Sequence, residues 1–123
     1  MKRKVLIINR NQPHISRISA EIRLDFWGTF RGLMFQKTVT EDTSLILDQK
    51  RDSRLDSSIH MLFMNFDIAA IWVNAAMQVV DTRLAKRWAL AYMPKSPARY
   101  IIEGPVQLLD QFTTGDQLEF RYE

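Results

Sequence analysis

The stretch Ile18-Ser19-Ala20-Glu21-Ile22-Arg23-Leu24 alternates apolar with polar side chains along its whole length. Because successive side chains of a β-strand point to opposite faces of a sheet, this period of two is typical of a strand with one face in the core and the other in water. Near the end of the chain, Leu118-Glu119-Phe120-Arg121-Tyr122 repeats the pattern. Both stretches therefore predict half-buried strands.

Other short apolar runs along the chain predict the remaining strands. The runs are rich in β-branched and aromatic residues, which favour a pleated, half-buried surface. We expect strands over residues 5–8, 18–24, 45–47, 59–63, 68–73, 79–84, 88–92, 100–102 and 118–122.

Two other segments have features typical of short helices. Apolar side chains recur with helical spacing from Phe26 to Met34, and Asp25 stands where an N-cap is expected. Pro105 suits a first helical position, and Leu108 and Phe112 follow it. Because these helices are too few and too short for crossovers between parallel strands, we predict a mainly β fold: a single-domain β-barrel or sandwich over residues 1–123, with about eight short strands and two short helices.

The composition fits an ordinary globular domain. The chain has 123 residues, of which 46% are hydrophobic and 25% charged, and its net charge of +3 permits anion binding without requiring it. With no cysteine, disulfides and thiolate metal sites are excluded. The apolar run over residues 5–8 is too short for an export signal and that over 68–73 is too short to cross a membrane, so we expect a cytoplasmic protein without a membrane segment.

Residues with catalytic potential are scarce. The two histidines, His14 and His60, do not have the spacing of a metal-binding motif, and we expect no metal or cofactor. His60 lies inside an apolar run and, together with Asp67 and Glu103, could form a histidine–carboxylate general base or a weak metal site. The simpler interpretation is that His60 is a hydrogen-bonded residue of a strand.

Four motifs occur along the chain: Arg31-Gly32-Leu33-Met34-Phe35, Ile59-His60-Met61-Leu62-Phe63-Met64, Ala98-Arg99-Tyr100-Ile101-Ile102-Glu103 and Gly115-Asp116. In this order they resemble the R-G-L-M-F segment, the central I-H-x-F-F-M strand, the A-R-Y-V-L-E segment and the closing G-D turn of one known family, DUF192, a family of domains of unknown function. The motifs occur in the family's order, from about residue 18 to 120. The chain departs from the family after Met64, where Asn65-Phe66-Asp67-Ile68-Ala69 replaces R-F-P-I-D.

The resemblance implies candidate positions and no substrate or cofactor. The candidate ligand-binding residues are Arg31, His60, Arg99, Tyr100 and Glu103. Among them, Arg31, Arg99 and Glu103 could instead form a buried ion pair, which we favour over an anion site because an isolated buried charge is costly.

Three functions agree with the sequence. The first is a non-catalytic binding or accessory module, in which a pocket or groove holds a small anionic or aromatic ligand or a strand of a partner peptide, near His60, Trp88, Tyr92, Arg99 and Tyr100. The second is a hydrolase-type enzyme that uses His60 with Glu103 or Asp67.

The third and least favoured function is binding of single-stranded nucleic acid. Basic Arg83, Lys86 and Arg87 precede the stacking rings of Trp88 and Tyr92. Since Trp88 and Tyr92 are four residues apart in a predicted strand, we expect both on its core-facing side, which speaks against nucleic acid as a partner.

Overall fold

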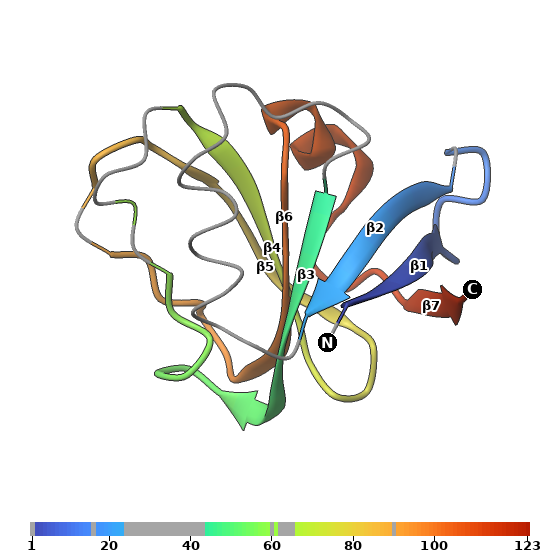
Figure 1. Ribbon diagram of the computed structural model, residues 1–123, viewed down its shortest axis with the longest axis horizontal. Helices are drawn as coiled ribbons and strands as arrows, with labels where there is room; N and C mark the ends of the chain where they lie inside the picture. The colour runs from blue at the N-terminus through green and yellow to red at the C-terminus, as the bar shows by residue number, and fades with distance from the viewer. Residues whose placement is uncertain (1, 16, 24–43, 60, 62–65, 90) are drawn as a thin grey trace.

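Seven strands and one short helix make up the described part of the chain. The computed structural model describes residues 2–15, 17–23, 44–59, 61, 66–89 and 91–123. The elements are β1 (Lys2–Asn9), β2 (Ile18–Arg23), β3 (Ser44–Ser53), β4 (Ile68–Val73), β5 (Val79–Ala85), β6 (Ala98–Gly104), the 3-10 helix η2 (Val106–Gln111) and β7 (Leu118–Tyr122) (Figure 1).

The strands form a single curled sheet in the order β5-β4-β6-β3-β2-β1-β7. All neighbouring strands are antiparallel except β2 and β3, which are parallel. The curl brings the two edge strands together where both begin: Leu118 N–H donates to the Met77 carbonyl at 2.8 Å and Val79 N–H to the Asp116 carbonyl at 2.9 Å. Gly115 N–H also donates to the Val79 carbonyl at 2.8 Å, and in the described part of the chain no backbone hydrogen bond joins β5 and β7 farther along the two strands. The sheet is therefore a half-barrel with an open seam.

Two apolar clusters pack on the two sides of the sheet. The first includes Ile71 and Ile102, and the second includes Trp72 and Ile101, so adjacent residues of β4 and β6 point to opposite clusters. Every residue of β4 is buried. A strand covered on both faces reads as a continuous apolar run, which explains the sequence of residues 68–73.

The observed structure confirms the predicted mainly β class and corrects two predicted elements. Residues 88–92 are not a strand: Trp88 lies in a turn with φ of +64°, and Tyr92 forms only an isolated bridge with Ile59. The helix predicted at Pro105 is present as six residues of 3-10 helix, with Pro105 as its N-cap. The helix predicted over residues 26–34 lies outside the described residues, as does most of the strand predicted over 59–63.

Candidate functional site

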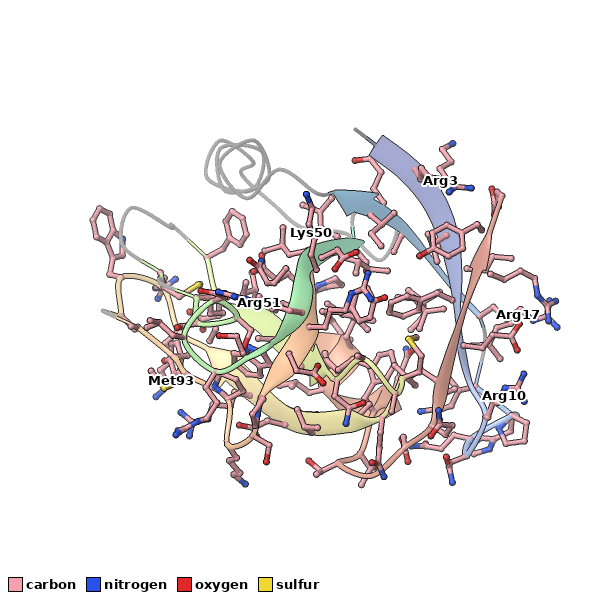
Figure 2. All side chains as sticks on the ribbon, turned by 90° about the horizontal axis from the view of Figure 1, so that it is seen from below. Arg3, Arg10, Arg17, Lys50, Arg51 and Met93 are labelled. Carbon is pink, nitrogen blue, oxygen red and sulfur yellow. The ribbon has the colours of Figure 1, made fainter. Side chains whose placement is uncertain are left out.

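A cavity of about 410 Å³ opens at the seam of the half-barrel, beside β7. Its lining combines apolar and aromatic side chains with a few polar ones: Arg10, Met77, Tyr100, Gln117, Leu118, Glu119, Phe120 and Tyr122. Figure 2 shows Arg10 at the end of the molecule that carries β1 and β7, with Arg51 and Met93 toward the opposite end. The cavity belongs to the side of the sheet that carries the first apolar cluster, which includes Tyr100 and Leu118.

Tyr100 is the central aromatic residue of this cavity. Its side chain is 7% exposed, and its ring meets the edge of the Phe120 ring with the centroids 5.1 Å apart. In the described part of the chain, nothing forms a hydrogen bond with its hydroxyl. Burial raises the pKa of Tyr100 above its ordinary value, with the nearby Arg99 charge opposing that shift. The Tyr100 hydroxyl is therefore a protonated donor at neutral pH.

Arg99 is held in place by Asp48. Its Nε lies 2.9 Å from Asp48 Oδ1 and a terminal nitrogen 3.1 Å from Oδ2, a two-point ion pair. The hydrogen bond with Asp48 raises the pKa of Arg99, although burial opposes it. The guanidinium carbon lies 4.9 Å from the centre of the Tyr100 ring, within cation–π range. A fixed positive charge therefore stands over the central ring of the cavity.

The polar wall of the cavity is an ion-pair network on β7. Glu119 accepts hydrogen bonds from Arg10 and Arg121, and these two arginines, Arg10 first, lower the pKa of Glu119. Arg3 lies 4.6 Å from the centre of the Tyr122 ring. Among the described residues, the cavity lining thus holds one arginine, Arg10, and one carboxylate, Glu119, while Arg3 and Arg121 contact the lining residues Tyr122 and Glu119.

Glu103 lies apart from this cavity. On β6 it stands opposite Leu45 and Ala70, and the period of two puts it on the same side as Ile101, with the second apolar cluster. Its side chain is 6% exposed, and burial raises its pKa to about 7. No hydrogen bond or ion pair reaches its carboxyl from the described residues. Arg99 pairs with Asp48 rather than with Glu103, and Arg31, the third residue of the predicted ion pair, lies outside the described residues.

Asp48, which takes the place predicted for Glu103, was missed by the sequence analysis. The residue follows the run predicted over 45–47, and β3 continues beyond that run to Ser53. Strand pairing places Asp48 directly opposite Tyr100, next to Arg99. No local pattern in the sequence indicates this pairing.

The remaining residues predicted to have a functional role are Arg31, His60 and Asp67. Arg31 and His60 lie outside the described residues. Asp67 is half-buried, and its carboxylate accepts a hydrogen bond from the backbone N–H of Arg87 at 2.9 Å. Within the described ranges, no three histidine or acidic side chains gather in a way that could hold a metal ion.

Trp88 and Tyr92 do not share a core-facing side, contrary to the prediction. Trp88 is 54% exposed, because its positive φ redirects the chain within the turn. Tyr92 packs against the second apolar cluster, and its hydroxyl accepts a hydrogen bond from Lys86 N–H at 3.1 Å. Of the two rings, that of Trp88 is therefore the more exposed to solvent.

The Gly115-Asp116 turn next to the cavity has a structural explanation. Gly115 adopts φ of +101°, which glycine tolerates at low cost. The Asp116 carboxylate accepts hydrogen bonds from Asn9 at 2.7 Å, from Gln12 at 2.8 Å and from Thr113 N–H at 2.9 Å. Burial would raise the pKa of Asp116, but these hydrogen bonds outweigh it, and the pKa is lowered. The network fastens the start of β7 to the end of β1.

The fold and the cavity define a class of protein: small β half-barrel domains with a cavity at the open seam. The chain belongs to the DUF192 family, whose model carries the description "Uncharacterized ACR" and matches residues 7–120. All four motifs that carry the resemblance lie within this range.

Several curated relatives, all called UPF0127 proteins, are similar in sequence. The protein of Thermococcus gammatolerans is 41% identical over 104 residues, which cover 85% of this chain and 66% of that protein. The Pyrococcus furiosus protein is 37% identical over 106 residues, covering 85% of this chain and 88% of its own length. The chain thus matches slightly less than two thirds of the Thermococcus gammatolerans relative.

Two solved structures share the fold at 15% sequence identity. A candidate transcription regulator from Sinorhizobium meliloti has a TM-score of 0.81 and covers 98% of this chain, with 94% of its own chain matched. A protein of unknown function from Novosphingobium aromaticivorans has a TM-score of 0.75, with coverages of 94% and 83%. At this identity the similarity establishes the fold alone. Within the described residues, no helix is long and apolar enough to cross a membrane.

Proposed function

We propose that the chain is a single-domain, non-catalytic binding module whose seam cavity holds a small planar anion, such as an aromatic carboxylate. The observation that carries this proposal is Tyr100, a largely buried residue that lines the cavity and whose hydroxyl has no hydrogen-bond partner among the described residues. A ligand oxygen in the cavity would accept a hydrogen bond from this hydroxyl.

The size and lining of the cavity support this class of ligand. Its volume of about 410 Å³ lies within the range of roughly 300 to 1,000 Å³ that small-molecule sites occupy. The apolar side chains of Met77, Leu118 and Phe120 would cover the faces of a ring. Arg99 over the Tyr100 ring and Arg10 at the mouth would favour a negative charge.

The acids of the region are poorly suited to catalysis. Among the described residues, Glu119 is the only acid that lines the cavity, and its arginine partners lower its pKa, which makes it a weak base. Glu103 belongs to the opposite side of the sheet, and Asp67 is bonded to a backbone amide. The hydrolase hypothesis would need His60, which lies outside the described residues, to reach one of these two acids. The geometry therefore supports binding better than hydrolysis.

A thermal-shift experiment tests the proposal. The probes are benzoate, 2-naphthoate and indole-3-acetate, with the uncharged amide of each as a matched control. We expect at least one carboxylate to raise the Tm in a concentration-dependent way, because a ligand that binds only the folded state stabilises it by mass action. The amides should have a smaller effect. If no carboxylate raises the Tm at millimolar concentration, the proposal is wrong.

A further inference from the structure

A second surface feature, the turn after β5, presents an exposed indole. Trp88 is 54% exposed and has φ of +64°, a conformation that is rare for a bulky side chain. Its backbone N–H donates to the Met61 carbonyl at 2.9 Å, and Met61 N–H donates to the Ala89 carbonyl at 3.1 Å. Both hydrogen bonds hold the turn against the neighbouring segment, so the fold maintains a costly backbone conformation that places a large aromatic ring at the surface.

Cationic side chains lie directly before this indole in the chain. Arg83 has 42% of its side chain exposed, and Lys86 and Arg87 are exposed as well. In the described part of the chain, neither Lys86 nor Arg87 forms an ion pair. Arg83 approaches Asp81 at 3.9 Å and lies 5.9 Å from the centre of the Tyr92 ring. The positive charge of this turn is therefore only partly compensated.

The acids near the turn are engaged by main-chain groups. The Asp67 carboxylate accepts a hydrogen bond from Arg87 N–H at 2.9 Å. The Asp81 carboxylate accepts hydrogen bonds from Thr82 N–H at 2.9 Å and from Lys95 N–H at 3.1 Å. Tyr92 adds a further restraint, since its hydroxyl accepts Lys86 N–H. The side chains of Lys86 and Arg87 extend from a backbone that these hydrogen bonds hold, and they remain available to an anion.

We propose that this turn, formed by Arg83, Lys86, Arg87 and Trp88, is a binding site for single-stranded nucleic acid. A nucleobase stacks on the Trp88 indole, and the adjacent phosphates contact the three cationic side chains. Single-stranded sites combine these two elements, because every base has a face that can stack and every linkage carries a negative charge. A membrane surface would require a broad apolar face around the basic residues, whereas this segment offers the Trp88 ring and the partly exposed Leu84 among three cations.

This site is separate from the seam cavity. None of its four residues lines the cavity. Substitutions in the turn and in the cavity therefore test the two proposals independently, and the failure of one does not decide the other.

Fluorescence anisotropy with labelled ten-nucleotide oligo(dT) and oligo(U) tests the proposal, over a range of NaCl concentrations from 25 to 200 mM. We expect the logarithm of the association constant to fall with the logarithm of the salt concentration with a slope of about −2, because each phosphate contact on a single strand contributes about −0.7. Trp88→Ala should weaken binding by roughly 5- to 100-fold without changing this slope, since base stacking is not ionic.

Variants of the same turn separate stacking from charge. Trp88→Phe should retain part of the affinity, because a smaller ring still stacks. The double substitution Lys86→Gln and Arg87→Gln should reduce the slope by about 1.4, which is two phosphate contacts. Val106→Ala, at an exposed apolar residue of η2, and Tyr100→Phe in the cavity should bind the oligonucleotides like the unsubstituted protein.

Three results would overturn the proposal. The first is no binding at 25 mM NaCl. The second is equal affinity of the Trp88→Ala variant, which would mean charge attraction alone. The third is Trp88-dependent binding to vesicles with 30% phosphatidylserine together with no binding to the oligonucleotides, which would assign the turn to a membrane surface.

Discussion

The ring of Tyr100 meets the ring of Phe120 edge to face, with centroids 5.1 Å apart and planes at 79°. Tyr100 belongs to β6 and Phe120 to β7, and three strands lie between these two in the sheet. The contact therefore crosses the concave side of the half-barrel rather than following a strand pair. Edge-to-face rings at this separation attract each other, so the contact helps to hold the curl from which the seam cavity results.

Tyr100→Phe should separate ligand binding from folding. The lost hydroxyl has no hydrogen-bond partner among the described residues, so the free energy of unfolding should change by less than about 0.5 kcal/mol. Affinity for a carboxylate probe found by thermal shift should fall by roughly 10-fold or more, the value of a hydrogen bond with a charged group. Chemical denaturation and calorimetric titration measure the two effects. An unchanged affinity would remove Tyr100 from the site.

The ion pair of Asp48 with Arg99 should show a measurable coupling energy. Asp48 is 8% exposed and the Arg99 side chain 33%, so solvent screens the pair only in part. We expect a double-mutant cycle of Asp48→Asn and Arg99→Gln to give a coupling of about 1 kcal/mol in urea denaturation. The pair of Arg51 with Asp56 is a control on the surface, where the Arg51 side chain is 76% exposed and the coupling should be smaller. Equal coupling in the two cycles would contradict the assignment.

Glu103 should make the protein less stable as the pH rises. Its pKa is about 7 in the folded protein, against an ordinary value of 4.5. Between these pH values the unfolded chain has released the proton and the folded chain keeps it, so the free energy of unfolding falls with rising pH, by about 3 kcal/mol in total.

Glu103→Gln removes this titration. The variant should be more stable than the unsubstituted protein at pH 8 by roughly 1 to 3 kcal/mol, and the gain should shrink toward pH 4.5. Urea denaturation at several pH values measures the difference. A gain that does not depend on pH would show that Glu103 does not titrate in this range.

Asp116 should have the opposite pH dependence. Its lowered pKa means that the charged form stabilises the fold at pH values above the unfolded pKa of about 3.9, and that this contribution is lost as the pH falls through the folded pKa. Asp116→Asn places an amide among the donors of Asn9, Gln12 and Thr113, so it should cost about 1 to 3 kcal/mol at pH 7. The cost should be smaller at pH 2. Thermal unfolding at both pH values checks this, and an equal cost at both would contradict it.

Gly104 should not tolerate a side chain, because a Cβ there would lie 2.4 Å from Leu108 Cδ1 and 2.8 Å from Ser44 Oγ. Leu108 and Ser44 are both buried, so we expect Gly104→Ala to destabilise the protein by about 1 to 3 kcal/mol. Gly115→Ala is the matched control, because nothing lies within 4 Å and only the backbone strain of φ +101° remains. That control should cost about 1 kcal/mol in the same denaturation experiment. The prediction fails if Gly104→Ala is as stable as the unsubstituted protein.

The alternation over residues 18–24 and 118–122 predicted strands that the structure contains as β2 and β7, and the apolar run over 68–73 predicted β4. Both signals, the alternation and the short apolar run, are local, because they involve only residues that are neighbours in the chain. The same patterns misled at Trp88, because a positive φ within a turn reverses the direction that spacing alone predicts. His60 and Arg31, nominated by the family resemblance, stay predictions.

By itself, then, the sequence determined the mainly β class and the family, and it nominated Arg99 and Tyr100 as candidate ligand-binding residues. Only the tertiary structure decided that Arg99 pairs with Asp48 and not with Glu103, and that Tyr100 meets Phe120 beside a cavity. The reason is physical: side-chain periodicity is a property of neighbouring residues, whereas these contacts depend on the order and curl of the strands, which bring together residues far apart in the chain.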